Sequence, residues 1–203
     1  MMVKSLKLLL LTVSLSGAIG LSLIARAPQA SQDGPTYRNG NSLVRPRDYA
    51  SWAFLGAGLG LTYQSETTGA PAEPRFTNVF VNPSSHRAFL ETGKWPNGTV
   101  FILEGRRSQT AGEPLTGGRY QGELVGIEAE VKDSRFPDGW AFFNFTQRNT
   151  NTLLDVAQPL SGDALAPCVQ CHTEHTAVER TFVQFYPRML EVARQKGTLK
   201  PGF

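Results

Sequence analysis

Two thiols and an imidazole stand together near the end of the chain, in the run Cys168-Val169-Gln170-Cys171-His172. A C-x-x-C-H run is the signature of a c-type haem attachment site. Thiols at this spacing can each form a thioether with one vinyl group of the same porphyrin, and the adjacent imidazole can bind the iron. The sequence contains no other cysteine. We therefore predict one covalent haem c, held by Cys168 and Cys171, with His172 as an axial iron ligand.

Other chemistries of paired cysteines stay open beside haem attachment. A thioredoxin-like redox pair is expected in a βαβ setting. A zinc site needs four ligands, and only His86, His172 and His175 could add to the two thiolates. A disulfide within the motif would close a very small loop, where the stabilisation is least.

Residues 1–30 have the features of a secretory signal peptide. Lys4 and Lys7 precede an uncharged apolar run over 8–24, and small residues follow at Ala27 and Ala30. The run is also long enough for an uncleaved membrane anchor. Either form predicts that the folded part is exported to the periplasm, the side on which c-type haem is attached. Membrane association is expected only if the leader is not cleaved.

The rest of the chain is long enough for one domain with a hydrophobic core. Hydrophobic residues make up 40% and charged residues 18% of the sequence, which is ordinary for a globular protein. The net charge of +3 is small and the basic residues are scattered, so no nucleic-acid partner is expected. We predict a flexible lead-in over 31–45, rich in Gly, Asn, Pro and Arg, and a haem domain over 46–203.

The hydrophobic pattern of this domain predicts an α+β fold. An antiparallel sheet is expected from strands over 76–81, 99–106, 120–131 and 140–145. Flanking helices are expected over 46–55, 83–92 and 152–160. Two C-terminal helices would carry the haem, over 168–179 and 181–195. The glycines at 56, 58 and 60 are expected to form a connection after the first helix.

No residue near the motif is a good candidate for a second iron ligand. Met189 and His175 lie close to His172 along the chain, on the same side of the haem, and His86 is expected at the surface of a helix. The iron is therefore predicted to be five-coordinate. An open coordination position favours binding or activating a small molecule over pure electron transfer.

Further motifs, in order over 46–187, resemble the cytochrome P-460 family: FTNVFVNP at 76–83, TGKWPNGT at 92–99, GIEAEVKDS at 126–134, GWAFF at 139–143 and TFVQFYP at 181–187. The family includes P-460 cytochromes that oxidise hydroxylamine and β-sheet cytochromes c-prime that bind nitric oxide. The resemblance implies a small homodimer with an antiparallel sheet packed over the haem, and a diatomic or other nitrogen-oxide ligand. The sequence does not identify the redox partner protein.

Three positions depart from the hydroxylamine oxidases of that family. In those enzymes a lysine of the second strand bonds to a haem meso carbon, and alignment on the NG turn at 97–98 places Leu103 there. Their distal arginine falls near Thr77, and the carboxylate that relays protons falls at Pro167. These differences favour nitric oxide binding over hydroxylamine oxidation.

The expected distal pocket is apolar. Phe101 and Leu103 share a strand face, Thr77 is expected nearby, and the next strand carries Phe142, Phe143 and Phe145. Such a pocket excludes water and polar ligands and admits uncharged diatomics. Three strand carboxylates could act as general bases but are expected to face solvent or form ion pairs: Glu104, Glu128 and Glu130.

Two other functions stay open. One is hydroxylamine oxidation, with Lys94 or Lys132 in place of the missing lysine, so whether the protein is an enzyme is undecided at this point. The other is electron transfer without a substrate, which the lack of a second Met or His ligand disfavours.

Overall fold

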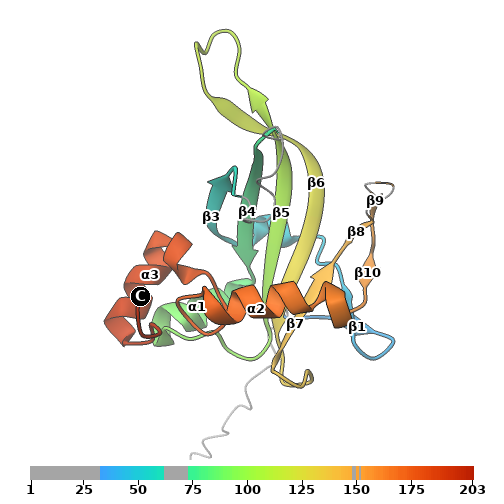
Figure 1. Ribbon diagram of the computed structural model, residues 1–203, viewed down its shortest axis with the longest axis vertical. Coiled ribbons are helices and arrows are strands. Elements are labelled where there is room, and N and C mark those ends of the chain that lie inside the picture. The colour runs from blue at the N-terminus through green and yellow to red at the C-terminus, as the bar shows by residue number, and fades with distance from the viewer. Residues whose placement is uncertain (1–32, 62–72, 148–149, 151) are drawn as a thin grey trace, which may run out of the picture.

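The computed structural model describes residues 33–61, 73–147, 150 and 152–203. Its main feature is a five-stranded antiparallel sheet in the order β3-β4-β5-β6-β7, with three α-helices gathered towards one end (Figure 1). This architecture confirms the predicted α+β class. The expected signal peptide lies outside the described residues. Within the described residues, no helix is long and apolar enough to cross a membrane.

The sheet consists of β3 (Ala53–Leu59), β4 (Arg75–Val81), β5 (Thr99–Thr110), β6 (Arg119–Lys132) and β7 (Trp140–Asn144). The four predicted strands are therefore confirmed. Two of them are longer than expected, because β5 and β6 continue pairing beyond the body of the sheet as a projecting hairpin (Figure 1).

The helices are α1 (Pro83–Thr92), α2 (Ala166–Glu174) and α3 (Pro187–Lys196). Helix α1 ends at Gly93, whose φ of 71° is a left-handed conformation that glycine adopts without strain. Helix α2 stops earlier than predicted, and a short 3-10 turn, η4 (Val183–Phe185), precedes α3. Pro187 begins α3, as expected of a residue with a fixed φ and no amide hydrogen.

Two predicted helices are wrong. Over 46–55 only one 3-10 turn forms, η1 (Tyr49–Ser51), and the glycine-rich segment after it is the edge strand β3. Glycine is a poor helix former, and at Gly56 an added Cβ would lie 3.2 Å from the Tyr186 ring. The second region, 152–160, contains two short strands, β9 (Thr152–Leu153) and β10 (Val156–Ala157), in place of a helix.

The expected flexible lead-in is part of the folded domain. Its residues include β1 (Tyr37–Arg38) and β2 (Ser42–Val44), which form a small sheet with β10. Leu43 is completely buried, which composition alone did not indicate. The remaining elements are β8 (Thr146–Gln147), paired with β9, and a 3-10 turn, η3 (Gly162–Ala164).

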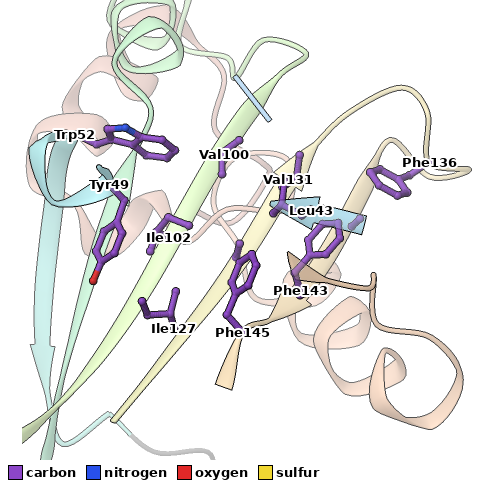
Figure 2. Close-up of a cluster of buried hydrophobic side chains, with 13 residues drawn as sticks. Leu43, Tyr49, Trp52, Val100, Ile102, Ile127, Val131, Phe136, Phe143 and Phe145 are labelled. Atoms are coloured by element: carbon purple, nitrogen blue, oxygen red, sulfur yellow. The ribbon is translucent and has the colours of Figure 1, made fainter. Parts of the chain in front are cut away.

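The large sheet separates two hydrophobic clusters. Figure 2 shows the first cluster, in which side chains from one face of β5, β6 and β7 meet the N-terminal segment; its labelled members are Leu43, Tyr49, Trp52, Val100, Ile102, Ile127, Val131, Phe136, Phe143 and Phe145. The second cluster lies on the opposite face, towards the helices, and includes Phe89 of α1 and Met189 of α3. Side chains alternate along a strand, so successive residues of one strand pack into different clusters.

A buried carboxylate joins the strands on the first face. Glu104 of β5 accepts hydrogen bonds from Tyr49, from Asn78 of β4 at 2.9 Å and from Arg106 at 2.6 Å and 3.2 Å. Burial alone would raise the pKa of Glu104, but these bonds from Arg106, Tyr49 and Asn78 together hold it below its ordinary value of 4.5. The Glu104 carboxylate therefore contributes to the stability of the fold.

We predict that Glu104→Gln lowers the free energy of unfolding at pH 7 by about 2 kcal/mol, the scale of a lost charged hydrogen bond in a buried site. Since the folded-state pKa is depressed, this contribution is complete above about pH 4.5 and is lost as the pH falls further. Guanidinium titrations of both holoproteins from pH 7 to pH 3 should show the difference shrinking. Glu123→Gln, at an exposed ion pair, is the matched control.

Candidate haem site

The imidazole of His172 has a defined orientation on α2. Its Nδ1 lies 2.7 Å from the Arg180 carbonyl oxygen, and a carbonyl can only accept, so Nδ1 carries the proton. When the imidazole is neutral, Nε2 is therefore the nitrogen that presents a lone pair, as an iron ligand must. The rings of Phe142 and Phe182 pack edge-to-face on the imidazole, each with a centroid separation of 4.8 Å.

Several hydrogen bonds hold the turn that supplies the Arg180 carbonyl. Glu179 adopts a left-handed φ of 51°, an uncommon conformation for a residue with a side chain. Its carboxylate accepts a 2.6 Å bond from Lys132 Nζ, and its backbone carbonyl accepts a bond from Thr176. The Thr176 hydroxyl also bonds the His172 carbonyl at 2.6 Å. The position of His172 therefore depends on a hydrogen-bonded turn, anchored to β6.

Helix α2 has no fully buried side chain, unlike α1 and α3. Cys168 and Cys171 are half-buried free thiols on this helix, and burial raises the pKa of both. An amphipathic helix normally gains its stability by packing an apolar face. The two thiols lie one turn apart beside the His172 imidazole, which is an arrangement that fits a haem. A bound haem would also supply the packing partner that α2 lacks.

The strand register places the expected pocket residues on one sheet face. Phe101 of β5 pairs with Glu130 of β6, which pairs with Phe142 of β7, and directly paired residues point to the same side. Leu103 follows Phe101 by two residues and shares this face, as does Thr77 on β4. Because Phe142 contacts His172, this is the face that looks towards α2.

The side chains on that face differ in how much they are exposed to solvent. Leu103 is 37% exposed, which leaves it available to line a ligand site, and Thr77 is half-buried. Phe101 is buried against Trp95, with ring centroids 4.8 Å apart, and so belongs to the core. The role of Leu103 and Thr77 in a distal pocket stays a prediction.

The structure separates the phenylalanines that were expected together in the distal pocket. Phe142 packs on the ring of His172, the predicted iron ligand, which would place it on the proximal side. Phe143 and Phe145 are buried in the first cluster, on the opposite face of the sheet (Figure 2). Alternation along β7 turns Phe143 away from Phe142, and sequence analysis had grouped the two by type rather than by face.

Glu130 also lies at this site. It was expected to face solvent or to form an ion pair, and its Oε1 lies 3.2 Å from His172 Nδ1, on a side chain that is only 11% exposed. Burial raises the pKa of Glu130, and this carboxylate raises the pKa of His172 against the effect of burial. The strand register is the signal that could have found it, because it places Glu130 between Phe101 and Phe142.

The alternative ligands and cross-link residues are buried in the core, exposed to solvent or already bonded to other groups. Met189 is buried in the second cluster and His175 is exposed. On α1, burial and then the nearby arginines lower the pKa of His86. Lys132 Nζ is bonded to Glu179 and to the Trp95 carbonyl, and Lys94 is exposed after α1.

A family model described as Cytochrome P460 matches residues 46–183, more than half of the chain. The chain belongs to the cytochrome P-460 family. No curated protein sequence matches the chain. Membership of the cytochrome P-460 family makes this a haem-binding c-type cytochrome. Haem supplies an iron centre for ligand binding and electron exchange. The chain orients the His172 imidazole through the Arg180 carbonyl and covers its ring with Phe142 and Phe182.

We predict that the reduced cytochrome stays high-spin when His86, His175 or Met189 is replaced. The reason is that Met189 is buried in the second cluster, His175 is exposed and His86 lies on α1. Met189→Leu keeps the volume of the core, and alanine suits the two histidines. Absorption and resonance Raman spectra of the ferrous holoproteins test this. A low-spin spectrum of the unmodified protein that becomes high-spin in one variant would identify a sixth ligand and contradict the prediction.

Proposed function

We propose that this member of the cytochrome P-460 family is an exported cytochrome with one covalent haem c that binds nitric oxide at an open iron position. Cys168 and Cys171 would hold the porphyrin and His172 the iron. The observation that carries the proposal is Leu103, which is the most exposed of the pocket candidates on the sheet face beside α2, where it pairs with Glu128 of β6. Nitric oxide is small and uncharged and needs no hydrogen-bonding partner to enter such a site.

The alternative, hydroxylamine oxidation, has less support. Leucine at 103 cannot form the covalent bond to the macrocycle that the hydroxylamine oxidases of this family have. Lys132 is already bonded to two acceptors on the side of the ligand histidine. Hydroxylamine oxidation must also release protons, which calls for a positioned general base, and Pro167 stands in the first turn of α2 where those enzymes carry a carboxylate.

Export and dimerisation belong to the same proposal. The basic, apolar and small-residue segments of the leader support export, and covalent haem attachment takes place outside the cytoplasm. A homodimer is what the family resemblance implies, and sedimentation of the holoprotein measures it.

Covalent attachment gives the first test. We predict that haem stays with the chain on acid–acetone extraction of the mature protein. Cys168→Ala and Cys171→Ala should each leave a single thioether and shift the pyridine haemochrome band, and the double variant should release its haem. Haem that is extracted from the mature, unmodified protein would refute this part of the proposal.

Ligand chemistry gives the second test. We predict that the ferrous protein binds nitric oxide, whereas hydroxylamine with an artificial electron acceptor gives turnover near background. Sustained turnover on the order of the median enzyme rate, about 10 per second, would instead establish an oxidase. Leu103→Lys is the informative variant, since a new covalent haem link would place residue 103 against the macrocycle, and Leu103→Met controls for the loss of the branched side chain.

A further inference from the structure

Glu130 carries a buried oxygen that its surroundings do not satisfy. Within the described residues, Glu130 Oε1 has no hydrogen-bond partner. His172 Nδ1 has a proton to give and lies 3.2 Å away, but that proton is directed at the Arg180 carbonyl, only 2.7 Å from the same nitrogen. The carboxylate therefore contacts the imidazole as an ion-pair partner, without a full hydrogen bond.

An arrangement of this kind is costly unless a positive charge lies nearby. The charged side chains that act on Glu130 are His172 and Arg180, which favour its ionised form, and Glu179, which opposes it. Arg180 is also directed to Asp138, 3.7 Å away. Buried polar groups in native proteins are nearly always satisfied, so the Glu130 oxygen needs an explanation, and a redox role is one such explanation.

Iron binding changes which positive charge faces Glu130. An imidazole that ligates iron through Nε2 keeps only the Nδ1 proton and is neutral, so it no longer balances the carboxylate. A ferric porphyrin carries a net positive charge, whereas a ferrous porphyrin is neutral. A buried anion beside the ligand histidine therefore favours the ferric state, and it also draws on the Nδ1 proton, which makes the imidazole a stronger donor.

We propose that Glu130 is a positioning residue of the haem iron, which acts through His172 to lower the reduction potential and to strengthen the iron–histidine bond. This inference rests on the proposed axial role of His172. It assigns a function to a carboxylate that otherwise destabilises its own site, and it predicts a reduction potential below that of a variant without the charge.

The test compares Glu130→Gln with the unmodified holoprotein. Glutamine keeps the size of the side chain and removes the charge. Spectroelectrochemical titration should show the ratio of reduced to oxidised haem, at a fixed potential, rising at least tenfold, which corresponds to about 59 mV for one electron. The iron–histidine stretching frequency of the ferrous protein should fall in the same variant.

Two matched variants separate the charge from other effects. Glu174→Gln removes the same charge two residues from His172, but at a side chain that is 54% exposed, so it should leave both readouts unchanged. Glu130→Asp keeps the anion and should restore the potential towards the original value. An unchanged potential in Glu130→Gln, or an equal shift in Glu174→Gln, would overturn the inference.

The same measurements distinguish failure of the inference from failure of the proposed function. If His172 does not ligate the iron, the iron–histidine band is absent from the unmodified protein. If the band is present but does not move in Glu130→Gln, the axial role stands and the role of Glu130 fails. If the Glu130→Gln protein does not mature with haem, the iron–histidine band of the unmodified protein still tests the inference. Its band should lie above that of a five-coordinate haem protein whose histidine donates only to a backbone carbonyl, and a band at or below that reference contradicts the inference.

Discussion

The hydrogen bond from His172 Nδ1 to the Arg180 carbonyl is the interaction on which the site depends. It fixes the tautomer of the imidazole and the direction of Nε2 in one step. The carbonyl is in turn held by a turn with a left-handed Glu179, which is anchored to β6 through Lys132. Trp95 ties the following residue, Thr181, to the end of α1 through a 2.9 Å bond. The large sheet, the first helix and the C-terminal turn thus converge on the orientation of one side chain.

The two faces of the sheet serve different purposes. The first face is closed by the chain's own aromatic and aliphatic side chains (Figure 2), and the Glu104 network adds directional bonds there. The second face is covered by α1, α3 and the segment around Tyr186, which packs where Gly56 has no side chain. Helix α2 lies along the same side but buries none of its side chains fully. A planar cofactor between α2 and the sheet would give this helix the packing that its sequence does not provide.

The sequence allowed the local elements to be predicted better than the long-range contacts around His172. The C-x-x-C-H run, the strands that become β4 to β7 and the capped helix α1 are local signals, and the structure has the same elements. The helix expected over 46–55 failed because glycines at alternate positions form an edge strand whose pairing with β4 is not visible locally. The partners of His172 come from three distant segments, and only the register of β5, β6 and β7 brings Phe142 and Glu130 to it.

Glu104 and Glu130 lie on adjacent strands, on opposite faces of the sheet. They show how the hydrogen-bond donors around a buried carboxylate decide its role. Glu104 accepts bonds from Tyr49, Asn78 and Arg106, and those bonds outweigh the effect of burial and hold its pKa low. Glu130 lacks such donors at Oε1, and burial raises its pKa. A satisfied carboxylate stabilises the fold, whereas an unsatisfied one destabilises it until a positive charge is placed nearby. Because the neighbour of Glu130 is the predicted iron ligand, the oxidised metal would add a positive charge beside this carboxylate, and the same contact that weakens the fold would set the redox behaviour of the haem.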